Sequence, residues 1–572
     1  MRRWLPLLVA FVVTLPSLGA GFSLDDWAQR AVVNGQLTHT TRYALFNFGA
    51  GDAEALRPLI ERGPFPWFTL PELKLRFLRP LSSALIVFDT EVFGSTAWPQ
   101  HLHSTLWYLA LTAIVLMLYR RLTPTVAVFA GVLFAIDDAH VMPTMWLANR
   151  NALVAVCFVW LGLWAHVRWR EDGWKPGVVV SAVAFAFGLA AGETAVAGLA
   201  YVLAYELLAR PQPWSSRLRA LTPVVLVLAG YAVLYKVLNS GARGSATYLD
   251  PLSEPLTFLT LAVPRFFANV GTQAFGAPDV YLALPEAKGL LIASGVVAVP
   301  VALLAWRRWA PTDEAERRTS RWLLLGAAGS LLPTLATFPA TRLLTAASLG
   351  LAPVVATLLR AAWRDTGLRR GLGVLWLGGA FVLQPLTQWL VMPIGFTTVS
   401  TRALEAVKAL DAKPTERFVV LSSSEFVPAI YTAPLMADLG LTMPRTWHVW
   451  SMAPLPVDVR RTGERQVELS VIGGRMIDSV FEENFRNDNF PIEAGQRVVI
   501  DATTVTVLTV EGGKPTSVRF DLDLPVEAFS FVWWDGDSLA RVQLPAIGAR
   551  LHFPRTQTMF ERLMVGKKPP VD

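Results

Sequence analysis

Two pairs of adjacent aspartates could carry acid–base chemistry. Asp25-Asp26 directly follows the first apolar segment, and Asp137-Asp138 ends a later one. Adjacent carboxylates raise each other's pKa, so either pair predicts a general base or oxygen ligands for a divalent cation. Structural interpretations compete: Ser23 and Asp25 suit a helix N-cap, and Asp137-Asp138 suits a solvated helix end. The local sequence leaves both interpretations open.

Three arginines lie beside apolar segments on a side of the chain where basic residues are otherwise rare. They are Arg79, Arg150 and Arg342. The planar guanidinium fork suits a phosphate oxyanion, and the alternative is an ion pair with one of the acids. Glu193 lies between two short apolar segments, where a carboxylate is costly unless it has a function or caps a helix. His140 completes the supporting candidates, and we expect no histidine metal site.

Membrane spans must position these residues. The chain has 572 residues, is 53% hydrophobic and only 17% charged, and has a mean hydropathy of +0.42. A soluble globular chain is roughly a quarter charged, so this composition predicts a polytopic membrane protein. We expect about eleven helical spans of roughly 20 residues. Their approximate bounds are 4–21, 101–119, 124–142, 150–167, 177–192, 194–209, 220–238, 289–306, 322–338, 345–362 and 372–391.

Composition also excludes several classes of protein. The formal charge of +7 comes from basic residues that punctuate apolar runs and form no separate patch, so we expect no nucleic-acid partner. Cys157 is the single cysteine, which excludes intramolecular disulfides, cysteine zinc sites and iron–sulfur clusters. There is no Walker loop and no G-x-G-x-x-G motif, and their absence argues against a soluble nucleotide enzyme.

Basic residues set the expected orientation. Arginine and lysine gather in one set of loops, whereas the short loops of the opposite side carry only Arg150 and Arg342. The positive-inside rule makes the first set cytoplasmic and places the N-terminus inside. An odd number of spans then places the rest of the chain after residue 392 outside. The first span could also be a secretory signal, but the residues after it look functional and we expect it to stay.

Two long outer loops and a C-terminal domain complete the expected organisation. The loops cover residues 22–100 and 240–287, and their apolar stretches Leu78–Val92 and Leu256–Phe275 could lie in the membrane interface. Apolar and polar residues alternate in Arg465–Val471, Arg497–Val510 and Ser517–Leu524, with a turn at 511–514. Arg417–Leu421 predicts a strand and Phe426–Leu439 a helix. We therefore divide the chain into a transmembrane domain, 1–392, and a β-rich α+β extracytoplasmic domain, 393–572.

The order of motifs resembles the membrane part of O-mannosyltransferase-like proteins of the glycosyltransferase C superfamily. These are the transmembrane-and-tetratricopeptide family and its bacterial relatives. The resemblance runs over roughly residues 1–390 and rests on six matches. These are Asp25-Asp26, Arg79-Pro80-Leu81, His101-Leu102-His103, the stretch from Phe134 to Asn151, and Gly192-Glu193 followed later by Thr341–Ser348.

Departures from the family pattern concern activity more than fold. Asp137 stands where the family has His, Met142 where it has Glu, and Ala152 where it has an acid. Tyrosines near Arg342 and the tetratricopeptide repeats are missing. A degenerate member without catalysis therefore stays among the alternatives.

The resemblance implies an all-α polytopic membrane domain that transfers a sugar from a polyprenyl-phosphate donor to an extracytoplasmic protein or glycan hydroxyl, with inversion. It implies Asp25 or Asp26 as the base, Arg79, Arg150 or Arg342 at the donor phosphate, and Asp137, Asp138, His140 and Glu193 in support. It also implies a bacterial inner-membrane location and no cofactor, although the acidic pairs could hold Mg²⁺ or Mn²⁺. The alternatives are a non-enzymatic protein that binds envelope polymers and a lipid-linked-sugar flippase.

Overall fold

The computed structural model describes residues 2–61, 63–276, 287–558 and 561–562. It forms two compact units. The helical unit comprises Met1–Gly21, Phe77–Ser240 and Glu254–Ile394, and the β unit comprises Phe22–Arg76, Gly241–Ser253 and Gly395–Asp572. The β unit therefore combines parts of both outer loops with the C-terminal residues. The expected boundary at residue 392 lies close to the start of the last stretch, and the assignment of domains stays a prediction.

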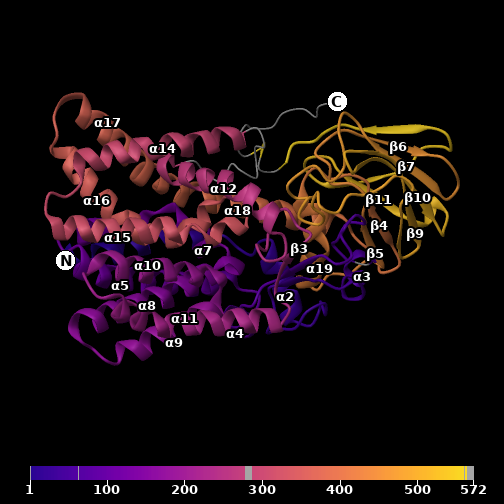
Figure 1. The fold of residues 1–572 in the computed structure, drawn as a ribbon. Coiled ribbons are helices and arrows are strands. Elements are labelled where there is room, and N and C mark those ends of the chain that lie inside the picture. The colour runs from indigo at the N-terminus through magenta and orange to yellow at the C-terminus, as the bar shows by residue number, and fades with distance from the viewer. Residues whose placement is uncertain (1, 62, 277–286, 559–560, 563–572) are drawn as a thin grey trace. The chain divides into compact units, whose positions relative to one another are not determined.

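Every predicted span falls on helical backbone in the helical unit (Figure 1). The N-terminal half contains α1 (Leu5–Thr14), α4 (Pro80–Phe93), α5 (Ala97–Leu122), α6 (Ala127–Ile136), α7 (Val141–Met145), α8 (Asn151–Asp172), α9 (Gly177–Ala191), α10 (Gly198–Ala204) and α11 (Trp214–Val237). The C-terminal half contains α12 (Pro255–Phe275), α14 (Ala287–Trp309), α15 (Glu314–Ser330), α16 (Ser348–Arg364), α17 (Gly367–Gly378) and the start of α18 (Gln384–Ala409), which belongs to the β unit from Gly395 on.

Among the described residues, five helical stretches are long and apolar enough to cross a membrane, or six if the bent pair α6 and Asp138–Met145 is one span. Other expected spans are short or interrupted. The third one breaks at Asp137, with a bend of 50°. The fifth and sixth are separated at Gly192, where Glu193–Ala197 forms a 3₁₀ turn. The number of eleven spans stays a prediction.

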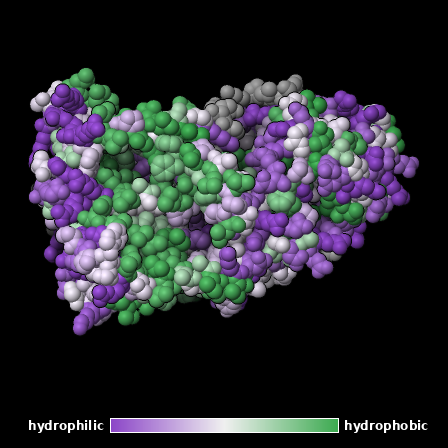
Figure 2. Space-filling model, in the orientation of Figure 1, coloured by the Kyte–Doolittle hydropathy of each residue, from purple (hydrophilic) through white to green (hydrophobic). Residues whose placement is uncertain are grey.

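The outer surface of the helical unit is apolar. On α11, Leu226 is 65% and Val237 is 74% exposed. Figure 2 shows hydrophobic residues over most of the face that this unit turns to the viewer. Contiguous apolar surface of this kind is unfavourable in water and suits contact with lipid. The helical unit is thus a multi-pass membrane structure by its surface as well as by its helices.

The two apolar stretches expected in the interface are helices of this unit. Leu78–Val92 becomes α4, and Leu256–Phe275 becomes α12, which packs along α14. A Cβ at Gly295 would lie 1.7 Å from the Phe267 carbonyl oxygen, so only glycine allows this approach. Arg265 and Asn269 on α12 are 4% and 0% exposed, and their polar ends contact Leu335 and Thr334. The helix therefore turns a polar face inward.

The β unit contains three sheets. Antiparallel strands form a six-stranded sheet in the order β13-β6-β7-β10-β9-β8, and a four-stranded mixed sheet has the order β12-β11-β4-β5. The first comprises β6 (Val457–Arg461), β7 (Gln466–Val471), β8 (Arg497–Ile500), β9 (Thr503–Glu511), β10 (Lys514–Leu522) and β13 (Arg550–Phe553). The second comprises β4 (Arg417–Val420), β5 (Thr446–Val449), β11 (Ser530–Trp534) and β12 (Leu539–Val542). A small sheet joins β1 (Asn47–Ala50), β2 (Lys74–Arg76) and β3 (Gly241–Arg243).

Local patterns predicted much of this unit. The turn at 511–514 connects β9 and β10, with Glu511 paired to Lys514 and positive φ at Gly512 and Gly513. The expected helix near 426–439 is confirmed as a π-helical turn, Val427–Tyr431, followed by α19 (Thr432–Asp438). The stretch Arg497–Val510 is two strands rather than one, because the chain turns at Asp501 with φ of 46°.

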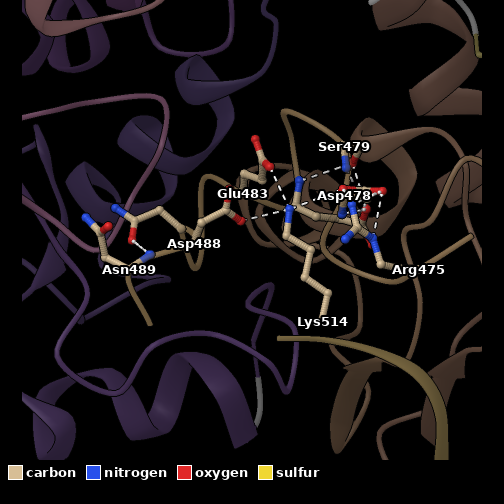
Figure 3. A network of polar contacts seen from close by, with 9 residues as sticks. Arg475, Asp478, Ser479, Glu483, Asp488, Asn489 and Lys514 are labelled. Atoms are coloured by element: carbon tan, nitrogen blue, oxygen red, sulfur yellow. Dashed lines mark hydrogen bonds and ion pairs between the residues drawn. The ribbon is translucent and has the colours of Figure 1, made fainter. Parts of the chain in front are cut away.

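A polar network fixes the long connection between β7 and β8 to the β9–β10 hairpin (Figure 3). The Lys514 ammonium lies 2.9 Å from both Glu483 and Asp488 and 3.2 Å from Asp478. Glu482 is fully buried and accepts a hydrogen bond of 2.8 Å from the Ser479 hydroxyl. Burial raises the pKa of the Glu482 carboxyl. These contacts order a connection that has no strand or helix of its own.

Candidate active site

Asp26 holds the start of α2 (Asp25–Val33) in the β unit. Its side chain is 3% exposed, and its carboxylate accepts a hydrogen bond of 3.0 Å from the Ser23 backbone N–H. A carboxylate reaching back three residues in this way satisfies a donor that a helix start leaves unpaired. Leu24, between them, has φ of 55°, which is unusual for a side chain of its size. The N-cap residue is Leu24, which makes no side-chain cap, so the expectation of an N-cap at Ser23 or Asp25 is wrong. Asp26 instead fixes the residue that precedes the N-cap.

Asp25 is half-buried and faces a side chain from the C-terminal part of the β unit. The Tyr431 hydroxyl donates a hydrogen bond of 2.6 Å to Asp25 Oδ1. The Tyr431 ring packs edge-on against Trp27, with centroids 6.1 Å apart. Burial, and then the charge of Asp25, raises the pKa of the Tyr431 phenol, so the phenol stays a donor. The Asp25 carboxylate is thus held by a phenol from about four hundred positions along the chain.

The second acidic pair lies in the helical unit. Asp137 and Asp138 are 7% and 8% exposed. Asp137 Oδ1 accepts a hydrogen bond of 3.0 Å from the Ala139 N–H, and Asp138 Oδ2 accepts one of 3.0 Å from Gln384 Nε2. A crevice beside this pair is lined by Asp137 and Gln273 together with apolar side chains. The solvated helix end considered from the sequence is not what the structure has, because both carboxylates are buried.

His140 belongs to the core of the helical unit. The ring is 0% exposed and lies 4.4 Å from the Phe134 ring, centroid to centroid. Its Nε2 lies 3.3 Å from the Ser348 hydroxyl. This contact joins the segment after the second acidic pair to α16, and His140 positions that segment rather than lining a surface.

Arg150 lies in a buried ion pair. The side chain is 3% exposed, and Nη1 lies 2.5 Å from Asp89 Oδ2. Its Nε donates to the Ser104 hydroxyl at 2.9 Å, and His103 Nδ1 lies 2.7 Å from the other Asp89 oxygen. This is the ion-pair alternative that the sequence left open for Arg150. Its partner Asp89, on α4, was not among the sequence candidates.

Arg79 and Glu193 pair with each other. Arg79 Nε lies 2.7 Å from Glu193 Oε2, and the two side chains are 20% and 27% exposed. Nearby, the Ser82 hydroxyl donates to the Ala191 carbonyl oxygen at 2.7 Å, which ties the start of α4 to the end of α9. Two sequence candidates more than a hundred positions apart thus form one partly exposed charge pair.

Arg342 is held by aromatic rings. Its guanidinium carbon lies 5.3 Å from the Trp146 ring centroid and 5.4 Å from that of Phe338. No carboxylate among the described residues lies within ion-pair distance of this half-buried side chain. Weakly hydrated guanidinium groups stack well on aromatic faces and keep their N–H donors for an anion. Arg342 is therefore suited to bind an anionic group.

The helical unit brings two of the sequence motifs together. The Thr345 hydroxyl donates to the Ala139 carbonyl oxygen at 3.0 Å, and Arg342 packs on Trp146, so the segments 137–150 and 341–348 meet. Asp25 and Asp26 belong to the β unit, and their convergence with Arg342 stays a prediction. Among the described residues, no group of three or more His, Cys, Asp or Glu side chains is placed to hold a metal ion.

Three features of these sites were missed from the sequence. Asp89 was visible as an acid inside the apolar stretch Leu78–Val92. The polar face of α12 was visible as Arg265, Asn269 and Gln273 at a spacing of four residues. Tyr431 had no such signal, because nothing in its local sequence points to a residue about four hundred positions earlier.

The chain resembles known proteins in structure and not in sequence. No protein-family model matches the chain, and no curated protein matches its sequence. Among solved structures, the chain is similar to the crystal structure of ArnT from Cupriavidus metallidurans bound to undecaprenyl phosphate. The sequence identity is 15% and the TM-score is 0.39, over 77% of this chain and 84% of that chain.

Proposed function

We propose that this protein is a membrane glycosyltransferase that moves a sugar from a polyprenyl-phosphate donor to an extracytoplasmic hydroxyl. The observation that carries the proposal is Arg342, an arginine held between Trp146 and Phe338 with no carboxylate of the described chain in ion-pair distance. An arginine placed in this way in a membrane-embedded unit suits the phosphate of a lipid whose tail stays in the bilayer. The sequence resemblance supports the same reaction.

The transfer step needs one base and one anion site. The acceptor hydroxyl oxygen attacks the anomeric carbon from the face opposite the phosphate, and the bond from that carbon to the phosphate oxygen breaks. The oxygen keeps the electron pair and leaves as polyprenyl phosphate, while the hydroxyl proton passes to a carboxylate. Since the phosphate is a good leaving group, a single carboxylate base suffices for inversion. An arginine at the phosphate offsets the charge that develops on it.

The contacts distinguish between the candidates for each role. We assign the base to Asp25, because the Asp26 carboxylate is buried against the Ser23 N–H. We assign the phosphate to Arg342, because Arg150 is buried against Asp89. The Arg79–Glu193 pair is partly exposed, so its polar atoms are suited to hydrogen-bond the hydroxyl groups of the donor sugar. Asp137, Asp138 and His140 hold the segment that carries Trp146.

We also propose the topology predicted from the basic residues: a bacterial inner-membrane protein with a cytoplasmic N-terminus and an extracytoplasmic C-terminal domain. A reporter that is active only outside the cytoplasm, fused after Asp572, should be active. Activity of a cytoplasm-only reporter at that position would overturn the orientation and, with it, an extracytoplasmic acceptor.

The function is tested with purified protein in detergent, a radiolabelled polyprenyl-phosphate sugar and an extract of envelope glycans and proteins. Wild type should release polyprenyl phosphate and label an acceptor. Arg342→Met should lose most of this turnover, and Arg342→Lys should keep part of it. Arg369→Met, a change at an exposed arginine elsewhere on the helical unit, is the matched control and should behave as wild type.

Two results would contradict the proposal. If Arg342→Met turns over as wild type does, the anion site lies elsewhere. If wild type binds the labelled lipid but releases no polyprenyl phosphate with any acceptor fraction, the protein is not a transferase. Accumulation of the lipid-linked sugar on the cytoplasmic leaflet of a deletion strain would then support a flippase.

A further inference from the structure

A short C-terminal segment packs directly on the helix that carries the candidate base. The π-helical turn Val427–Tyr431 and α19 lie against α2 within the β unit. Arg30 of α2 makes a two-pronged contact with Asp438, with Nε 2.9 Å and 3.1 Å from the two carboxylate oxygens. Their side chains are only 6% and 4% exposed. Since breaking such a buried pair is costly, the two helices are held together firmly.

The contact places one phenol at the base. Tyr431 lies between Trp27 of α2 and Phe426, with ring centroids 6.1 Å and 5.6 Å away. The packed ring fixes the hydroxyl, which donates to Asp25 Oδ1 over 2.6 Å. The bond length is that of a charge-assisted hydrogen bond between a hydroxyl and a carboxylate. The ring contacts set the position of the oxygen, and the oxygen sets the rotamer of the carboxylate.

We propose that Tyr431 is a positioning residue for Asp25, so that the C-terminal domain completes the catalytic centre instead of acting as a separate binding module. The inference rests on the proposed function, since it takes Asp25 as the base. Tyr431 fixes the orientation of the carboxylate through the hydrogen bond from its hydroxyl to Asp25 Oδ1. Proton transfer itself remains with Asp25, and Tyr431 keeps its proton.

The test is Tyr431→Phe, which keeps the ring and its packing and removes only the hydroxyl. Loss of a hydrogen bond to a charged group predicts a fall in kcat of about tenfold to a hundredfold, with KM nearly unchanged. The acid limb of the pH profile of kcat/KM should move to higher pH, because the carboxylate loses a donor that favours its charged form. The matched control is Tyr43→Phe, at a tyrosine that is 65% exposed in the loop that also contains Asp25. This variant should keep the kcat and the pH profile of wild type.

A second variant covers the case in which Tyr431→Phe does not fold. Replacement of Tyr431 by a fluorotyrosine keeps the hydroxyl and makes it a stronger donor, so the acid limb should move to lower pH. If neither substitution moves the acid limb of the pH profile while wild type transfers sugar, the positioning role is overturned and the proposed function is left intact. Absence of transfer by wild type overturns both.

Thermal unfolding separates the contact from the reaction. A double-mutant cycle with Asp25→Ala and Tyr431→Phe should give non-additive shifts in Tm, because each change removes one end of the same hydrogen bond. Additive shifts would show that the two groups are not coupled and would overturn the proposal independently of any activity.

Discussion

The two acidic pairs are both adjacent aspartates, and their carboxylates have the same two kinds of hydrogen-bond donor. In each pair one carboxylate accepts a backbone N–H: Asp26 accepts from Ser23, and Asp137 from Ala139. The other carboxylate accepts from a distant side chain: Asp25 from Tyr431, and Asp138 from Gln384. The two carboxylates of each pair therefore have different hydrogen-bond donors. One of them fixes the local backbone, and the other is positioned by a residue far along the chain.

Exposure distinguishes the two pairs. Asp25 is half-buried, whereas Asp138 is 8% exposed in the helical unit. A general base needs a route for an acceptor hydroxyl, while a buried carboxylate with an amide donor serves packing. The comparison is consistent with the proposed base at Asp25 and with the proposed supporting role of Asp138. It also predicts that the same substitution has effects of different size at different aspartates.

The largest effect is expected for Asp25→Asn. The amide keeps the shape of the carboxylate but cannot take a proton, so turnover should fall by about 10²–10⁴-fold, the usual contribution of a general base. Asp138→Asn should keep turnover within about tenfold of wild type, on the same scale. Both variants are measured in the transfer assay, after their Tm values show that they are folded.

The reverse result would break the comparison. A large loss for Asp138→Asn together with near-normal turnover for Asp25→Asn would make the buried pair the catalytic one. Equal losses would mean that the exposed fraction of the carboxylate does not decide its role.

The carboxylate beside the buried Arg150 should have a large effect on stability. Asp89→Asn removes the charge that faces Arg150 and leaves the guanidinium buried, at a cost of about 3–5 kcal/mol in the free energy of unfolding. Asp172→Asn is the control. It removes a partner of Arg121 whose side chain is 37% exposed, and such surface pairs add little to stability. Denaturant unfolding in detergent measures both, and a cost for Asp89→Asn as small as the control's would contradict the buried-pair interpretation.

Local sequence predicted those parts of the fold that depend on local interactions. The turn at 511–514 required two glycines with positive φ, and Gly512 and Gly513 supply them. The strand β4 and the helix that follows it were predicted from the short stretches Arg417–Leu421 and Phe426–Leu439. The break of the third span at Asp137 was marked by the acid itself. Each of these features is determined within about ten residues.

Contacts between distant residues could not be predicted in this way. The Trp67 indole donates to the Trp450 carbonyl oxygen over 3.0 Å, and Arg486 donates to the Phe68 carbonyl oxygen over 2.7 Å. These contacts bring the first outer loop into the core of the β unit, and neither partner has a local pattern that indicates the other. The same limitation hid Tyr431, so the sequence could not decide between Asp25 and Asp26.

A moderate effect on stability is expected at Gln384, the hydrogen-bond donor to Asp138. Gln384→Met removes the amide that donates to Asp138, and losing a hydrogen bond to a charged group costs about 1.5–3 kcal/mol. Gln384→Glu should cost more, because it places a second carboxylate against Asp138. Turnover per folded molecule should stay near that of wild type in Gln384→Met. A loss of turnover without loss of stability would assign Asp138 to the reaction and bring the two pairs closer in function.

The smallest effect separates the two members of the first pair. Asp26→Ala removes the acceptor for the Ser23 N–H and should cost about 0.5–1.5 kcal/mol, as the loss of a single hydrogen bond does. Asp26→Asn keeps an oxygen at the same place and should cost close to nothing, since an amide oxygen also accepts a hydrogen bond. Both variants should keep the turnover that Asp25→Asn loses, because the backbone N–H needs an acceptor and not a base. Thermal unfolding and the transfer assay on the same preparations measure the two properties. If Asp26→Asn is stable but inactive, the proton goes to Asp26, and the Tyr431–Asp25 contact supports the base from the neighbouring position.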